Sequence, residues 1–181
     1  MSLTKSATVQ AWLLSWLDQC LLRRVPQDDA QSTSALRWSI LAYFATDLFQ
    51  ALPGTDQAQA FGMAMADTLL MILFSWAVLT LSGKATRWVQ TLTALAGTGM
   101  LLSLFAMPLV LQVSRSVESG GAPGALLVSA WLLLLVWSIA VQAHIFRHAL
   151  STRYGVGVLI AILHTLLAIT LLQALFTPPE V

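Results

Sequence analysis

Long apolar runs alternate with short polar ones along most of this chain. A membrane-spanning helix needs about 20 mostly apolar residues to cross about 30 Å of hydrocarbon, and four windows meet that requirement: residues 61–81, 88–113, 125–146 and 154–176. A fifth window, residues 36–52, is shorter and carries Asp47 and Gln50. The pattern predicts an all-α integral membrane bundle of five transmembrane helices within residues 36–176. A short outer tail, residues 177–181, would follow it.

The first 35 residues have the pattern of an amphipathic helix. Polar or small side chains recur at helical spacing: Thr8, Ala11, Ser15, Asp18, Gln19 and Arg23. The opposite face is apolar: Val9, Trp12, Leu13, Trp16, Leu17, Cys20 and Leu21. We expect an interfacial helix on the cytoplasmic side of the membrane, with Trp12, Trp16, Arg23 and Arg24 as its anchors. The alternative is that this helix packs against the bundle or against a partner protein.

Composition supports a membrane location and excludes several classes of protein. The chain is 57% hydrophobic and only 9% charged, whereas a soluble domain carries about 25% charged residues. Its net charge of +1 gives no basic surface for nucleic acid. Cys20 is the only cysteine, which excludes an intramolecular disulfide. The first 24 residues lack the pattern of a cleavable signal peptide, so we expect the first transmembrane helix to direct insertion.

The basic residues predict the orientation, because cytoplasmic loops are enriched in Lys and Arg. With five spans, eight of them fall on one side: Lys5, Arg23, Arg24, Arg37, Lys84, Arg87, Arg147 and Arg153. Arg115 alone falls on the other side. We therefore expect a bacterial inner-membrane protein with a cytoplasmic N-terminus and an outer C-terminus. The count depends on residues 36–52 crossing the membrane, so it also favours that short span.

Asp47, Asp67 and His164 form a candidate intramembrane polar site, because an ionisable residue in hydrocarbon is costly. Asp47 lies about five residues before the outer end of its span and Asp67 about six residues after the outer start of the next, which sets both roughly 8 to 9 Å deep. If they share a face, they could share a proton or bind a cation. The alternatives are contact with water or headgroups, a capping hydrogen bond to a neighbouring backbone group, and for Asp67 a place near a helix N-terminus.

Histidines add two further hypotheses. His164 lies near the middle of the last span, where it is either a neutral imidazole bonded to a neighbour or part of a proton relay. His144 and His148 stand one helical turn apart, as two metal ligands on one face would. No third ligand accompanies them, so we expect interfacial anchoring there and neither a metal site nor a cofactor.

The third span has small residues at Gly97, Gly99 and Ser103, which would let helix backbones approach closely. Pro108 could kink this span or mark its outer end. Enzyme signatures such as GxSxG or a phosphate-binding loop are missing. We therefore expect a helix-packing role for the small residues and no enzymatic activity.

Two stretches of the chain resemble the Yip1-domain family of five-span membrane proteins. GKATRWVQTLTALAGTGMLLSLFAMP, residues 83–108, is similar to the family's glycine-led turn, Trp- or Phe-containing helix start, small-residue middle and later proline. WSIAVQAHIFRHALSTRYGVGV, residues 137–158, resembles its fourth helix, short basic turn and entry to the fifth. The resemblance points to the bacterial members. Eukaryotic members associate with small GTPases and shape membrane traffic, and no catalytic residue carries over.

Two functions follow as hypotheses. The first is a scaffold or accessory subunit of the inner membrane that binds partner membrane proteins, copies of itself or lipids. The second is a small ion-coupled transporter or channel-like protein that uses Asp47, Asp67 and His164. Lipid remodelling by the N-terminal helix is a weaker third hypothesis.

Overall fold

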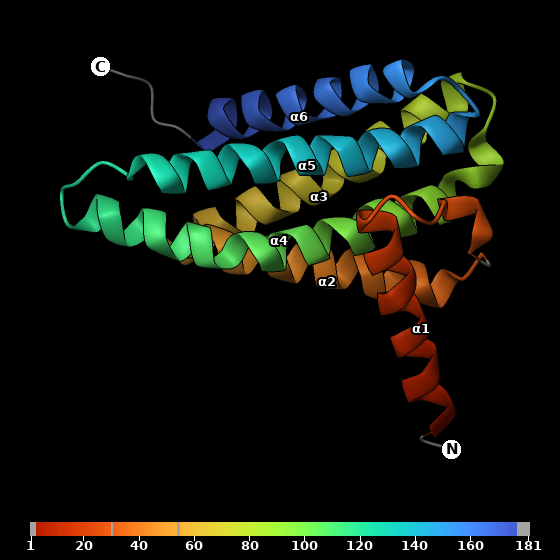
Figure 1. Cartoon of the computed structure of the whole chain (residues 1–181), viewed down its shortest axis with the longest axis horizontal. Coiled ribbons are helices and arrows are strands. Elements are labelled where there is room, and N and C mark those ends of the chain that lie inside the picture. Colours follow the sequence, from red (N-terminus) through yellow and green to blue (C-terminus); the bar gives the residue numbers. More distant parts are fainter. Residues whose placement is uncertain (1–2, 30, 54, 177–181) are drawn as a thin grey trace.

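The chain folds into a bundle of long helices with one helix projecting from its side (Figure 1). The computed structural model describes residues 3–29, 31–53 and 55–176, so the predicted tail at 177–181 lies outside the described residues. The elements are α1 (Leu3–Cys20), η1 (Pro26–Asp28), α2 (Thr33–Ala51), α3 (Gln57–Leu81), η2 (Ala85–Arg87), α4 (Trp88–Glu118), α5 (Ala125–Leu150) and α6 (Tyr154–Phe176). The described residues contain no strand, which agrees with the predicted all-α class.

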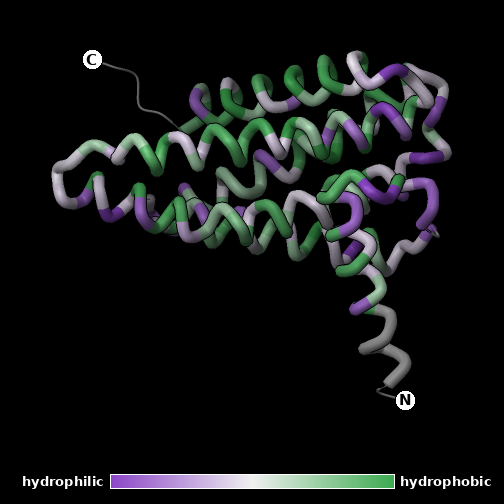
Figure 2. Tube along the Cα trace, viewed as in Figure 1, coloured by the Kyte–Doolittle hydropathy of each residue, from purple (hydrophilic) through white to green (hydrophobic). Residues whose placement is uncertain are grey.

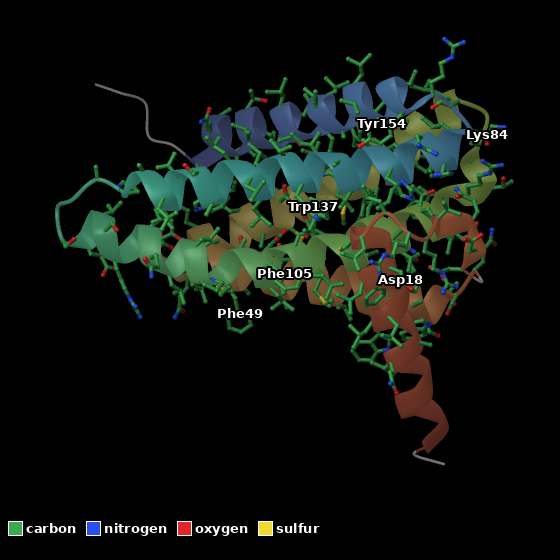
Figure 3. The ribbon with its side chains drawn as sticks, viewed as in Figure 1. Asp18, Phe49, Lys84, Phe105, Trp137 and Tyr154 are labelled. Carbon is green, nitrogen blue, oxygen red and sulfur yellow. The ribbon has the colours of Figure 1, made fainter. Side chains whose placement is uncertain are left out.

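Four helices, α3 to α6, are long and apolar enough to cross a membrane. Figure 2 shows apolar residues along these helices and polar residues gathered mainly toward the ends of the bundle. Large apolar side chains also point outward, as Phe49 on α2 and Phe105 on α4 do in Figure 3. These features indicate a multi-pass membrane protein. The fifth predicted span, α2, lies beside α4 and α3 in the bundle but is less apolar.

Several helix ends differ from the predicted boundaries. α3 begins four residues earlier than predicted, because the Asp56 side chain caps it by accepting hydrogen bonds from the backbone N–H groups of Ala58 and Gln59 at 2.9 and 3.0 Å. α4 continues to Glu118, so Pro108 lies inside the helix and does not mark its end. A transmembrane helix tolerates proline where neighbours or local adjustments compensate for the lost hydrogen bond.

Glycine and arginine end the helices at the turns. Gly83 (φ 67°) follows α3 and Gly120 (φ 72°) follows α4, both in the left-handed conformation that glycine adopts without strain. At the end of α5, the Arg87 guanidinium donates to the carbonyl oxygens of His148 and Ala149 at 3.2 and 2.9 Å. A cation there satisfies carbonyls that lack a helical partner.

The core of the bundle lies between α3, α4 and α5. It is built on buried apolar residues: Met71, Leu92, Leu95, Val141, Ile145 and Phe146. α5 and α6 approach closely at Gly157, where a β-carbon would meet the backbone carbonyl oxygen of Ala143. This packing fixes the inward faces of the helices that carry the polar residues discussed next.

Candidate functional site

Asp47 and Asp67 face the same cavity. Asp47 lies near the end of α2 and Asp67 in the first half of α3, and both line a space of about 540 Å³. The other lining residues are Gln50, Ala51, Met63, Ala64, Val110, Trp131 and Leu172. We call this space the carboxylate cavity. Because both carboxyl groups line this one space, two negative charges there would repel each other.

Each carboxylate receives one hydrogen bond from a neighbouring helix. The Tyr43 hydroxyl donates to Oδ2 of Asp67 at 2.5 Å, and the Ser103 hydroxyl donates to Oδ1 of Asp47 at 3.4 Å. Oδ2 of Asp47 is buried and has no hydrogen-bond partner. An unsatisfied buried oxygen of this kind is costly, so Asp47 can accept a further donor or a cation.

Asp67 is not at the N-terminal end of its helix. Because α3 begins at Gln57, Asp67 is its eleventh residue, well past the first turn, where the helix dipole would favour an anion. That role belongs to Asp56, which caps the helix. The helix-terminus interpretation of Asp67 was therefore wrong, and its immediate stabilising contact is the hydroxyl of Tyr43.

His164 lines a second cavity of about 190 Å³, which we call the histidine cavity. Its other lining residues are Tyr43, Met71, Leu95, Thr98, Gly99, Leu102, Ser103, Ser138 and Gln142. His164 is 9% exposed and its Nδ1 lies 2.9 Å from Oε1 of Gln142. The ring also packs against Phe74, with 5.0 Å between ring centroids. Its Nε2 is buried and has no hydrogen-bond partner among the described residues.

The three predicted helix-packing residues of α4 contact three different side chains. A β-carbon at Gly97 would collide with the indole of Trp16, and one at Gly99 would collide with the ring of Tyr43. Ser103 approaches Asp47 through its hydroxyl, and its carbonyl oxygen accepts from Gln50 at 2.7 Å. Small residues thus let α4 approach aromatic rings as well as a carboxylate.

The predicted interfacial anchors differ in how deeply they are buried. Trp16 is 5% exposed and packs on α4 with Cys20, Met100 and Leu101, so it does not point toward headgroups. Trp12 is partly buried against the same cluster. Arg23 is exposed, as an anchor would be. The predicted anchor role of Trp16 was wrong because the glycine at position 97 leaves a recess that the indole occupies.

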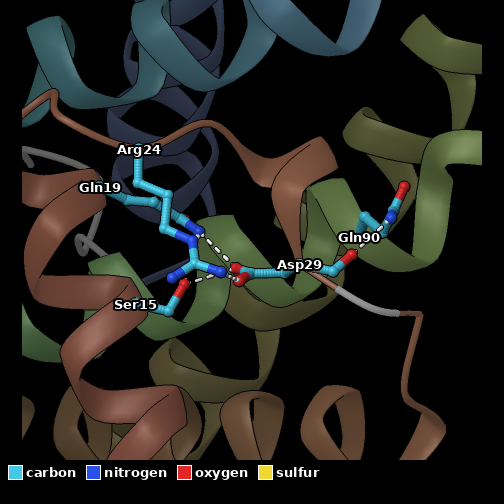
Figure 4. Close-up of polar contacts among 5 residues, drawn as sticks. All are labelled: Ser15, Gln19, Arg24, Asp29 and Gln90. Atoms are coloured by element: carbon cyan, nitrogen blue, oxygen red, sulfur yellow. Dashed lines mark hydrogen bonds and ion pairs between the residues drawn. The ribbon is translucent and has the colours of Figure 1, made fainter.

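A polar cluster that the sequence did not suggest holds α1 to the bundle (Figure 4). The Asp29 carboxylate accepts from Ser15 at 2.5 Å and from Gln19 at 2.8 Å. It also forms an ion pair with Arg24 at 2.8 Å, so Arg24 is not a free headgroup anchor. The backbone carbonyl oxygen of Asp29 accepts from Gln90 at 2.6 Å. The available signal was the one-turn spacing of Ser15 and Gln19, which gives them a common face.

His144 and His148 stack edge to face, with 4.6 Å between ring centroids. Nε2 of His144 lies 3.2 Å from the backbone carbonyl oxygen of Arg24, so this buried residue ties the segment after α1 to α5 and is not an interfacial anchor. Among the residues that the structure describes, no group of three or more His, Cys, Asp or Glu is arranged to hold a metal ion.

The geometry can support exchange of a proton or a small cation. The carboxylate oxygens offer negative charge, and Tyr43, Ser103 and Gln142 supply neutral hydrogen-bonding groups around them and around His164. No protein-family model matches the chain, and no curated protein or solved structure matches it either. The predicted resemblance to the Yip1-domain family therefore stays a prediction.

Proposed function

We propose that this protein is a small ion-coupled transporter that binds a proton or a monovalent cation between α2 and α3. The observation that carries the proposal is the shared cavity of Asp47 and Asp67. Ionisable residues inside a membrane bundle are rare, because hydrocarbon makes them costly, and those that occur commonly mark ion or proton pathways. Two such residues that line one space with few donors fit reversible binding of positive charge.

The hydrogen bonds of the two carboxyl groups support this proposal. The two carboxyl groups present four oxygens, and the structure gives donors to one oxygen of each. Placing two carboxylates in a low-dielectric site without a compensating cation or proton would cost several kcal/mol, about the scale known for unpaired buried charges. A bound proton or cation removes that free-energy cost, and release of the ion restores the cost. This balance would allow the site to bind and release the ion reversibly.

We propose further that α2 is a fifth transmembrane span in a bacterial inner membrane, with the N-terminus in the cytoplasm and the C-terminus outside. The α3–α4 turn, the α5–α6 turn and the segment between α1 and α2 lie at one end of the bundle (Figure 1). These are the segments rich in Lys and Arg. The positive-inside rule would then assign that end to the cytoplasm.

The test is ion flux in liposomes that contain the purified protein. With an imposed membrane potential, we expect the wild type to carry a cation or proton current, and Asp47→Asn and Asp67→Asn to abolish it. The matched control is Asp56→Asn, because asparagine caps a helix about as well as aspartate and Asp56 lies outside the cavity. Size-exclusion chromatography confirms folding. Equal currents in folded Asp67→Asn protein and wild type would reject the proposal.

A second candidate, a non-enzymatic scaffold or accessory subunit of the Yip1-like kind, rests on α1. This helix projects from the bundle and leaves Val9, Leu13, Leu14 and Leu17 exposed, as is Leu21 directly after it. Such a face fits a partner membrane protein or the lipid interface. Purification in a mild detergent tests it. Recovery of a partner that is lost in Leu13→Ser/Leu17→Ser protein would favour a scaffold, and recovery of a solitary monomer would argue against it.

A further inference from the structure

Two residues connect the histidine cavity with the carboxylate cavity. Tyr43 lines the histidine cavity, and its hydroxyl donates to Asp67 in the carboxylate cavity. Ser103 also lines the histidine cavity, and its hydroxyl donates to Asp47. Two hydroxyl groups therefore link the two spaces, and each can both donate and accept a hydrogen bond.

The contact with Gln142 defines the chemistry of His164. Because the amide oxygen Oε1 can only accept, this contact requires the neutral tautomer of His164 that carries its proton on Nδ1. Nε2 is then an unprotonated acceptor, and it has no donor among the described residues. A buried basic nitrogen without a donor, beside a cavity that has room for several water molecules, is ready to receive a proton.

The surroundings of His164 contain little other charge. From α2 comes Tyr43, whose hydroxyl donates to Asp67 of α3. The helices α4 and α5 contribute uncharged polar groups to the histidine cavity: Thr98, Ser103, Ser138 and Gln142. The nearest negative charge that could balance an imidazolium at His164 is therefore on the carboxylate pair.

We infer that the ion carried by this protein is the proton, and that His164, Tyr43 and Asp67 are successive stations of one path between the two cavities. This inference rests on the proposed function and adds the identity of the ion. A metal cation such as Na⁺ prefers several oxygen ligands. The unpartnered Nε2 of His164 is a nitrogen and is not a ligand of that kind. Chains of Asp, Glu and His are the groups that relay protons in membrane pumps and transporters.

Each transfer conserves bonds. A hydronium ion in the histidine cavity gives its proton to Nε2 of His164, which forms an N–H bond and leaves water. The imidazolium returns that proton to a water molecule, which passes one to the Tyr43 oxygen as Tyr43 passes its own to Oδ2 of Asp67. For every O–H or N–H bond that forms, one breaks. Asp67 then holds the proton as a neutral acid beside Asp47, and release into the carboxylate cavity completes the path.

The experiment measures proton uptake into liposomes with a pH-sensitive dye inside, driven by a potassium diffusion potential. We expect His164→Gln to reduce the rate at least about a hundredfold, the lower end of the range for loss of a positioned proton-transfer group. Tyr43→Phe should do the same, and it keeps the ring that packs on Gly99. The matched control is His148→Gln, which changes a histidine outside both cavities and should leave the rate near that of wild type.

Sodium current is measured on the same liposomes, so that the two proposals can fail separately. A sodium current that requires Asp47 and Asp67 but is unchanged in His164→Gln would overturn the proton path and leave the ion site standing. Currents unchanged in both Asp variants would reject the ion site and the path with it. If His164→Gln protein does not fold, Tyr43→Phe decides alone, and a wild-type rate of proton uptake in that variant contradicts the relay.

Discussion

Gly97 and Gly99 are two positions apart on α4, and each lies beneath an aromatic ring from a different helix. The indole of Trp16 on α1 covers Gly97, and the ring of Tyr43 on α2 covers Gly99. In a membrane bundle, close approach of this kind replaces the hydrophobic effect as the main source of helix association. A single methyl group at either position should therefore have a measurable cost.

We predict that Gly97→Ala lowers the free energy of unfolding by about 1–3 kcal/mol, the usual cost of overpacking. The reason is that a β-carbon at position 97 has no space beside the rigid indole of Trp16. Thermal unfolding in detergent measures the change. Gly155→Ala is the matched control, since a β-carbon there meets nothing within 4 Å. Equal midpoints for the two variants would contradict the packing argument.

Residue types alone were sufficient to predict Asp47, Asp67 and His164 as a candidate polar site, because an ionisable side chain is costly in a membrane. The residues that contact them could not be predicted from residue type. Tyr43 counts as an apolar residue in a hydropathy pattern although its hydroxyl contacts Asp67, and Gln142 is one polar position in a long apolar run. Which residues face each other depends on the rotation of each helix about its axis, and that is set by packing between neighbouring helices, as at Gly99 on α4 and Gly157 on α6.

At the scale of elements, α1 is held to the bundle by two unlike contacts. Trp16 and Cys20 pack against α4 on one side, and Asp29 gathers Ser15, Gln19 and Arg24 on the other. The cluster is only partly exposed, so these charge-assisted hydrogen bonds are screened less than a surface pair would be. Loss of the Asp29 carboxylate would leave three donors without their acceptor.

Asp29→Ala should therefore increase opening of α1 about fivefold or more, as expected for loss of about 1 kcal/mol. Cys20 reports this opening, because it is 5% exposed in the closed state. Burial raises the pKa of its thiol to about 11, so little reactive thiolate is present near neutral pH. Labelling of the closed state should rise as the pH approaches that value.

The measurement is the rate of maleimide labelling of Cys20 at fixed pH, with Asp28→Ala as the control. Asp28 is exposed and adjacent in sequence, and no hydrogen bond to its side chain is found among the described residues. Similar rates in the two variants would show that the Asp29 cluster does not hold α1.

The helical elements themselves were largely predictable, since apolar length alone located α3, α4, α5 and α6 to within a few residues. The errors have local causes. The Asp56 cap moved the start of α3 outward, and Pro108 did not end α4. The amphipathic pattern of α1 was ambiguous because Trp16 and Ser15 are both buried, although they belong to opposite faces of the predicted helix. Docking on the bundle overrode that pattern.

At the scale of the whole molecule, the basic residues gather toward one end of the bundle. Lys84 lies at that end in Figure 3, with the α3–α4 and α5–α6 turns. The opposite end carries the α4–α5 turn, where Arg115 is the nearest basic residue in sequence. This asymmetry gives the orientation a direct test.

We predict that a cysteine at position 119 is labelled from outside intact cells and that one at position 152 is not. Both substitutions, Ser119→Cys and Thr152→Cys, are made in a Cys20→Ser background, and both native side chains are exposed. A membrane-impermeant maleimide is applied to spheroplasts before and after lysis. The reverse pattern would place the α4–α5 turn in the cytoplasm and contradict the five-span orientation.

The contacts between α2 and α4 have a consequence for how the protein is made. α2 is the least apolar of the bundle helices proposed to span, and two of its polar side chains, Asp47 and Gln50, find partners on Ser103 of α4. During synthesis α2 leaves the ribosome long before that serine exists. If α2 spans the membrane as proposed, its stable insertion would depend on α4, and the proposed ion site would be completed only after α4 has joined the bundle.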